Sequence, residues 1–178
     1  MKNIIPLLLI SLSCNVYSQV IIGDTIGTAS DKTSVLLEFA AGQKKGLILP
    51  YVKTVPTSPA EGTIVLDATT PNEARVRYYN GSWQDLSGQD GNVTDELTTQ
   101  HNVAEANGSK AIIGSNTTTA DGVLVLESNT KAMILPQVGS TNDIPHPSPG
   151  MMVYVNRSGG KRLAFYNGSV WSYWKPAQ

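Results

Sequence analysis

The chain contains a single cysteine, Cys14, and little charge: Asp, Glu, Lys and Arg together make up 15% of its 178 residues. The remainder of the chain therefore has no disulfide framework and no thiol nucleophile. Acidic and basic residues are scattered and nearly balanced, with a net charge of −1. This balance argues against a surface that binds nucleic acid or an anionic membrane.

Catalytic and metal-binding motifs are also missing. The sequence has no HExxH, CxxC, GxGxxG or GxSxG arrangement and no phosphate-binding loop. Its two histidines, His101 and His146, lie far apart and have no repeated partners, so a two-histidine metal site is not expected. Oxygen-bearing residues alternate between Asp90 and Asp95, but without the spacing of a calcium loop, which favours a solvated turn. We predict no catalytic residue, no bound metal and no cofactor.

Helical periodicity is almost absent from the chain. The apolar segments are short, are bounded by turn residues and are rich in Val, Ile, Leu and Tyr, which is typical of β-strands. One exception is a polar stretch in which Val93 and Leu97 share one side of a short helical turn, with Thr94 as its cap. The sequence therefore predicts an all-β fold with almost no helix.

The chain repeats one pattern of strands and turns. An apolar block that ends in Glu38 returns as a block that ends in Glu127, and the block around Pro50 returns around Pro136. A Tyr-Asn-Gly-Ser segment beside a tryptophan closes each series. Duplicated modules of this kind usually form structural or binding arrays, because each copy needs a neighbour to bury its apolar face.

The repeat divides the chain into four parts. Residues 1–18 are predicted to be a signal peptide, residues 19–88 the first β module, residues 89–107 a polar linker and residues 108–178 the second β module. Short strands with glycine-rich turns leave exposed edges, and small modules bury little apolar surface alone. We therefore expect the chain to self-associate, with a homotrimer as the expected state.

The first residues have the pattern of an export signal. Lys2 supplies a positive charge, residues 4–12 are apolar, and Ser18 precedes a predicted cut before Gln19. The apolar run is too short to cross a bilayer as a stable helix, so a cleaved signal is favoured over a membrane anchor. Cys14 leaves a lipid-modified N-terminus as the alternative.

Each module is expected to hold two hairpin-like units. In the first module, residues 34–39 and 46–52 form one unit, and residues 63–67 and 75–79 form the other. A third strand follows an Asn-Gly pair, and the second module repeats this order. Asn-Gly is a strong signal for a type I′ hairpin turn, which needs positive φ at both central residues.

Glu38 and Glu127 are the only carboxylates that match between the two copies. A pair of carboxylates can hydrolyse a glycosidic bond when both flank it in one cleft, but these two belong to separate modules. Each ends an apolar strand, where a glutamate commonly faces solvent or pairs with a nearby lysine, such as Lys44 or Lys131. A structural role is therefore favoured over that of a hydrolase.

Aromatic residues flank both Asn-Gly turns. Packing across the strands of a tight hairpin is the favoured interpretation, and an exposed platform for a sugar ring is the alternative. On the second interpretation the candidate binding residues are Tyr79, Trp83, Tyr166, Trp171, Tyr173 and Trp174. Trp174 lies outside the matched block and is expected to be an exposed contact residue.

The repeated blocks resemble a module of secreted Bacteroidota surface proteins, and similar modules occur in phage tail-fibre-like proteins. The residues that carry the resemblance are Leu36-Leu37-Glu38, Ile48-Leu49-Pro50 and Asn80-Gly81-Ser82-Trp83, then Leu126-Glu127, Ile134-Leu135-Pro136 and Asn167-Gly168-Ser169. The resemblance covers most of the chain apart from the linker and carries no catalytic residues. It implies an extended, β-rich fibre or adhesin-associated part, often homotrimeric, with proteins that accompany gliding adhesins in Flavobacteria as the nearest setting.

On this resemblance, the protein is expected to be a non-enzymatic structural or adhesive component of the cell surface. The expected partner is a larger adhesin or outer-membrane complex, bound through protein–protein contact, with glycan binding as the alternative function. Export to the cell surface or outer membrane is expected, with the periplasm as a further location. Asp24-Thr25-Ile26 resembles the O-glycosylation pattern of Bacteroidota, which makes Thr25 a candidate glycosylation site.

Overall fold

The computed structural model describes residues 19–99 and 108–174. Residues 1–18, 100–107 and 175–178 lie outside the described residues. They include the predicted signal peptide with Cys14, and His101 of the linker. Within the described ranges the protein is nearly all β, with one short α-helix, so the predicted all-β fold class is confirmed. No helix in these two ranges is long and apolar enough to cross a membrane.

Each module folds into seven strands that follow in the same order. The first module contains β1 (Val20–Ile22), β2 (Val35–Phe39), β3 (Leu47–Ile48), β4 (Tyr51–Val52), β5 (Ile64–Asp67), β6 (Arg75–Tyr79) and β7 (Trp83–Asp85). The second contains β8 (Ala111–Ile113), β9 (Leu124–Leu126), β10 (Ala132–Met133), β11 (Gln137–Val138), β12 (Met151–Val155), β13 (Arg162–Tyr166) and β14 (Trp171–Tyr173). Helix α1 (Thr94–Thr99) lies between the modules, and a 3₁₀ turn, η1 (Thr141–Asp143), precedes β12. The repeat in the sequence is therefore also a repeat of structure.

The types of strand pairing repeat as well. β1 lies parallel to β2 and β8 lies parallel to β9, while β4 lies parallel to β5 and β11 to β12. β5, β6 and β7 form an antiparallel meander, as do β12, β13 and β14. The predicted unit of residues 63–67 and 75–79 is therefore confirmed as the β5–β6 hairpin, and the predicted third strand as β7.

The predicted hairpin-like unit of residues 34–39 and 46–52 is wrong. β2 does not pair with β3: it lies parallel to β10 of the second module, whereas β3 lies antiparallel to β12. Antiparallel neighbours can be joined by a tight turn, but a parallel neighbour must arrive from elsewhere in the chain. The two modules thus exchange one strand each.

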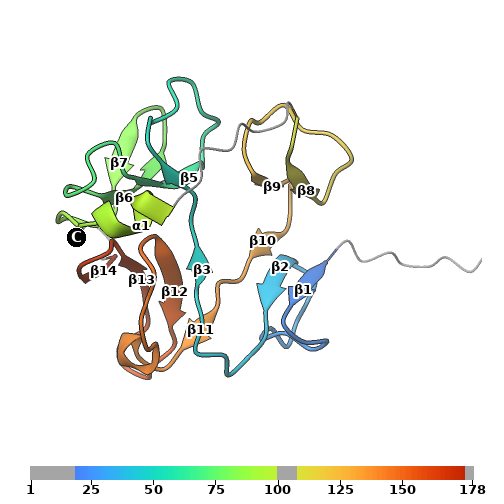
Figure 1. Ribbon diagram of the computed structural model, residues 1–178. Helices are drawn as coiled ribbons and strands as arrows, with labels where there is room; N and C mark the ends of the chain where they lie inside the picture. The colour runs from blue at the N-terminus through green and yellow to red at the C-terminus, as the bar shows by residue number, and fades with distance from the viewer. Residues whose placement is uncertain (1–18, 100–107, 175–178) are drawn as a thin grey trace, which may run out of the picture.

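The two modules cross one another in space (Figure 1). The first runs from β1 and β2 at the lower right to its meander at the upper left, and the second runs from β8 and β9 at the upper right to its meander at the lower left. β3 and β10 carry the chain between the sheets of their own modules, and each pairs with a strand of the other module. The sequence boundaries between the modules remain predictions, since strand pairing interleaves the two halves.

The apolar core draws on both modules. One buried cluster contains residues from the first module and its following segment together with two from the second: Leu49, Leu66, Ala68, Ala74, Val76, Val93, Met152 and Phe165. A smaller cluster lies within the second module: Val138, Ile144, Met151, Val153, Val155 and Ala164. Separating the modules would expose the side chains of the first cluster on both sides, so the halves depend on each other for burial.

The beginning of the polar linker is also part of this core. The predicted helical turn is present as α1, and Asn92 Oδ1 accepts a hydrogen bond from the Thr94 N–H at 3.0 Å. Asn92, rather than Thr94, therefore supplies the side-chain acceptor at the start of the helix. Val93 has no exposed surface, and its N–H donates to the Pro71 carbonyl at 2.8 Å.

Candidate functional site

The two Asn-Gly hairpins bring four of the predicted binding residues together in pairs. Tyr79 and Trp83 are cross-strand neighbours in β6 and β7, and their ring centroids lie 5.4 Å apart in an edge-to-face arrangement. Tyr166 and Trp171 occupy the matching places in β13 and β14, with ring centroids 5.3 Å apart. All four side chains are partly buried. Each pair packs across its own hairpin, as aromatic cross-strand pairs commonly do.

The predicted type I′ turns are wrong, although both hairpins are present. The connecting loop holds residues 80–82 in the first module and residues 167–170 in the second. Within each loop only the glycine has positive φ, 73° at Gly81 and 105° at Gly168. A type I′ turn needs positive φ at the asparagine as well, and loops longer than two residues leave the asparagine backbone in a relaxed conformation.

Asn167 joins the second hairpin to the segment that follows the first module. It is fully buried, and its Oδ1 accepts the N–H groups of Ser169 and Val170, both at 3.0 Å. Its Nδ2 donates to the Gln89 carbonyl at 2.8 Å. Asn80, the matching residue of the first hairpin, is exposed. Nothing in the shared Tyr-Asn-Gly-Ser motif distinguishes these two asparagines, so the sequence pattern could not reveal this contact.

Tyr173 and Trp174 lie at the end of β14 and are more exposed than the paired aromatic residues. Tyr173 is 38% exposed, its hydroxyl forms a hydrogen bond with the Thr141 hydroxyl at 2.8 Å, and the Arg162 guanidinium lies 5.0 Å from its ring centroid. Trp174 is 50% exposed. In the described part of the chain, aromatic contacts hold each hairpin pair together but do not join the two pairs to each other.

Glu38 is fully buried in β2 and is surrounded by hydrogen-bond donors. Its carboxylate accepts the N–H groups of Thr28 and Ala29 at 2.8 and 2.9 Å, and it also bonds the Gln19 amide and the Lys32 ammonium. Burial raises the pKa of Glu38, but these donors outweigh it and hold the pKa below its usual value of 4.5.

The prediction that Glu38 faces solvent is wrong, whereas the alternative, pairing with a nearby lysine, is confirmed: the lysine is Lys32 rather than Lys44 or Lys131. The loop between β1 and β2 folds back over the carboxylate and places Lys32 against it. Gly27 passes so close that a Cβ there would lie 2.2 Å from the Glu38 carboxyl carbon. The partner lysine therefore lies in the loop that precedes β2 and not in the segment that follows it.

Glu127 occupies the matching place in the second module but is held far less completely. It is partly buried, and its described side-chain partner is the Thr118 hydroxyl. Glu38 lies in β2 and Glu127 directly follows β9, a strand of another sheet, and the two have separate partners. The geometry therefore gives no support to a pair of carboxylates acting on one bond.

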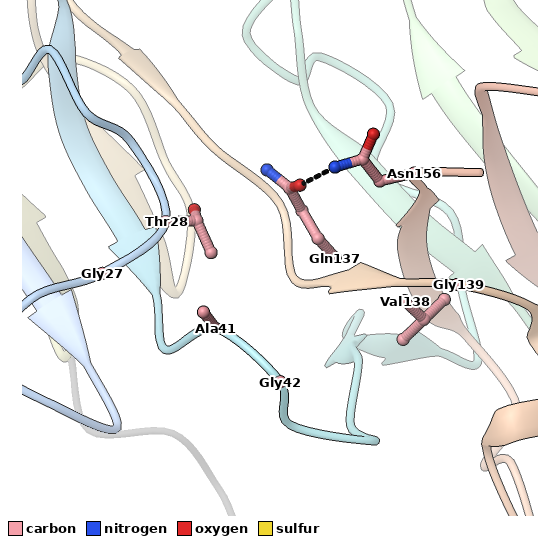
Figure 2. A pocket seen from close by; sticks show the side chains of 8 residues that line it. All are labelled: Gly27, Thr28, Ala41, Gly42, Gln137, Val138, Gly139 and Asn156. Atoms are coloured by element: carbon pink, nitrogen blue, oxygen red, sulfur yellow. Dashed lines mark hydrogen bonds between the residues drawn. The ribbon is translucent and has the colours of Figure 1, made fainter. Parts of the chain in front are cut away.

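One surface hollow, of about 350 Å³, lies between the β1–β2 loop and β11 (Figure 2). Its walls are small side chains and amides: Gly27, Thr28, Ala41, Gly42, Gln137, Val138, Gly139 and Asn156. Gln137 Oε1 accepts a hydrogen bond from Asn156 Nδ2 at 2.8 Å, so the two amides are directed at each other. These side chains include no general acid or base. Across residues 19–99 and 108–174, no three His, Cys, Asp or Glu side chains gather where they could hold a metal ion.

Thr25, the candidate glycosylation site, lies exposed in the turn after β1. Asp24 Oδ1 holds this turn by accepting the N–H groups of Ile26 and Gly27 at 3.0 and 2.6 Å. The hydroxyl is therefore accessible on an ordered turn, and its glycosylation stays a prediction.

Large apolar side chains are also exposed on or beside short strands. Ile22, Ile48, Val123 and Leu124 are each between 44% and 57% exposed. Single exposed apolar residues are ordinary, but an open strand edge with apolar side chains is a place where another strand can add. The sequence pattern could not show that Leu124 is exposed. Its match in the first module, Val35, is also apolar, and yet Val35 is buried.

The sequence of both modules matches a known family. The chain matches the phage tail like trimerisation region over residues 25–102 and 112–177, which includes both meanders and the strands β3 and β9. No curated protein and no solved structure matches it. A trimerisation region is a structural element, which supports a non-enzymatic, trimeric module and the homotrimer expected from the exposed edges. The chain belongs to the phage tail like trimerisation region family.

Proposed function

We propose that the protein is a non-enzymatic structural module that holds three copies of itself together in an assembly at the bacterial surface. The observation that carries this proposal is the family match across both modules. The exchange of β3 and β10 between the modules supports it, because it shows that each module is completed by strands from another. The exposed apolar residues on short strands provide surface that a second copy can bury.

The proposed setting is a fibre or adhesin assembly of Bacteroidota, reached after export. The export-like pattern of residues 1–18 supports delivery to the cell surface or outer membrane, with the periplasm as the further location. In this setting the trimer binds a larger adhesin or outer-membrane complex through protein–protein contact. Affinity purification from native cells should recover that larger protein, and recovery of the trimer alone would contradict the partner without affecting the trimer.

Sedimentation equilibrium of the purified protein tests the trimer directly. We expect a particle with three times the mass of the chain at micromolar concentration. A particle with the mass of one chain, or of two, would contradict the proposal. Repeating the measurement at high salt separates apolar association from charge pairing, and the low charge content predicts little change.

Glycan binding is the second candidate, and one observation favours it. Trp174 is exposed, and Tyr173 is exposed beside Arg162, whereas the other predicted aromatic residues pack in pairs. Quenching of tryptophan fluorescence by a polysaccharide should be lost in Trp174→Ala and kept in Trp83→Ala. Equal quenching in both variants would contradict a glycan site at Trp174.

A further inference from the structure

We propose that β9 of one chain is completed by β3 of another copy of the same chain, in the way that β2 is completed by β10 within the chain. This proposal rests on the proposed trimer and names the strands that form its interface.

The same strand has two neighbours in one module and one in the other. In the first module, β2 lies between β1 and β10. In the second, β9 pairs with β8, and no described strand lies on its other edge. β9 matches β2 in the repeat, and β10 matches β3. The strand that would complete β9 on the same pattern is therefore a β3. Within one chain β3 pairs with β12 and does not reach β9, so this β3 comes from another copy.

Burial follows the difference in pairing. Val35, which lies opposite Ala132 of β10, is 3% exposed, whereas the matching Leu124 of β9 is 44% exposed. Leu37 is 0% exposed, whereas the matching Leu126 is only partly buried. The side chains are apolar in both strands, and the strand that has the additional neighbour is the buried one.

The backbone of β9 presents its free groups toward the open edge. The Val123 carbonyl accepts the Ala111 N–H, and the Glu127 N–H donates to the Ile113 carbonyl, both at 2.9 Å. Peptide groups point alternately to the two sides of a strand. Val123 and Glu127 thus face β8, and Leu124 and Leu126 direct their N–H and C=O groups away from it.

β3 carries the complementary groups on its outer edge. The Leu49 N–H donates to the Gly150 carbonyl at 3.0 Å, toward β12. Ile48, one residue earlier, therefore directs its N–H away from β12, and its side chain is 50% exposed. The matching Ile134 N–H donates to the Leu37 carbonyl at 2.8 Å. On the same pattern, the Ile48 N–H of one copy donates to the Leu126 carbonyl of another.

One hydrogen bond of the internal pattern is not expected between copies, because its acceptor carbonyl is directed at β8. The Ala132 N–H donates to the Ser34 carbonyl at 2.8 Å. The matching carbonyl in the second module, that of Val123, already accepts the Ala111 N–H. The contact between copies therefore centres on Ile48 and Leu126.

Each chain carries one donor strand and one acceptor edge, so the contact runs head to tail. A head-to-tail contact forms a closed ring when the rotation between neighbours returns to the first chain. The family match indicates three copies, so the ring that we infer contains three chains. A closed ring leaves no β9 edge open, which also removes a site of uncontrolled strand addition.

A photo-crosslinker at position 124 tests the contact. We replace Leu124 with benzoylphenylalanine, irradiate the purified protein, isolate the covalent dimer and digest it with trypsin. Lys45 and Lys53 bound a peptide that contains β3, and Lys110 and Lys131 bound one that contains β9. The expected product joins residues 111–131 to residues 46–53. A dimer whose crosslinks fall only outside residues 46–53 would overturn the assignment.

Leu124→Lys, with Leu124→Val as the matched control, tests the same edge through the mass of the particle in solution. The lysine places a charge on the apolar edge, and we expect at least a tenfold rise in the concentration at which the trimer half dissociates, with an unchanged circular dichroism spectrum. Leu124→Val keeps an apolar strand residue and should leave the trimer intact. A stable trimer in Leu124→Lys would overturn the strand assignment while leaving the proposed function standing. If the unaltered protein is itself a single chain, the proposed function fails.

Discussion

The two modules share one order of strands but differ in how completely their matching residues are contacted. In the first module, β2 is buried between two parallel neighbours and contains the Glu38 carboxylate, which receives four donors. In the second, β9 has one described neighbour, and the Glu127 carboxylate that follows it bonds a threonine hydroxyl. The repeat therefore specifies the order and type of pairing, whereas the burial of each strand depends on what packs against it.

The hairpins reverse this difference. Asn167 of the second module is buried and bonds Gln89, while Asn80 of the first is exposed at its loop. The parallel strands thus have more contacts in the first module, and the hairpin loop has more contacts in the second. Substituting matched residues in both modules measures how much each difference contributes to stability.

The largest difference is expected at the matched glutamates. Glu38→Ala leaves buried N–H groups and Lys32 without their acceptor, which should lower the free energy of unfolding by about 3 kcal/mol. Glu127→Ala removes one described side-chain hydrogen bond and should cost about 1 kcal/mol. Denaturant unfolding of both variants measures the difference. Equal losses would show that the donors around Glu38 contribute nothing beyond a single hydrogen bond.

The next difference is expected at the hairpin glycines. Alanine at Gly81 or Gly168 is strained by positive φ, at a cost of about 1–2 kcal/mol. At Gly168 the new Cβ would also lie 2.7 Å from the Asn92 carbonyl oxygen, whereas nothing lies within 4 Å at Gly81. Gly168→Ala should therefore lower the melting temperature more than Gly81→Ala. The reverse order would contradict the close packing of the second hairpin.

A smaller difference is expected at the asparagines of the same loops. Asn167→Ala removes three hydrogen bonds from a buried site and should cost about 2 kcal/mol. Asn80→Ala changes an exposed residue and should stay within about 0.5 kcal/mol of the parent. Thermal unfolding of the two variants side by side provides the comparison, and a matching loss at Asn80 would refute it.

The smallest effect is a dependence of stability on pH. Because the pKa of Glu38 is lower in the folded protein than its usual 4.5, its contribution is complete above that value. The contribution is lost as the pH falls through the lowered folded value. The stability difference between the parent and Glu38→Gln should therefore shrink as the pH falls from about 6 to about 3. A difference that stays constant across this range would mean that the carboxylate charge is not what the donors stabilise.

The local part of the fold could be predicted from the sequence, and the long-range part could not. Turn residues between two short apolar segments identify β5–β6, and the Asn-Gly pairs identify the hairpins that end each module, because these pairings join neighbours along the chain. β3 and β10 are two residues long and pair with strands of the other module. So short a segment has too few alternating positions to specify a distant partner.

The candidate site shows the same limit. The aromatic pairs across both hairpins follow from their spacing around the turns, and the structure contains them. The surroundings of Glu38 depend on a loop that folds back over β2, and no periodic pattern encodes that path. The exposure of Leu124 depends on a neighbour that β9 lacks within the described chain. Such features become visible only when matched residues are compared in the folded protein.

Hydrogen–deuterium exchange of the β2 and β9 amides, at concentrations above and below dissociation of the assembly, tests most directly whether a second copy completes the open module. The Leu126 amide should exchange slowly in the assembly and quickly in the single chain, because its peptide group points to the open edge. The β2 amides should be protected at both concentrations, since β1 and β10 cover them within the chain. Fast exchange at Leu126 in an intact trimer would contradict completion of β9 by another copy.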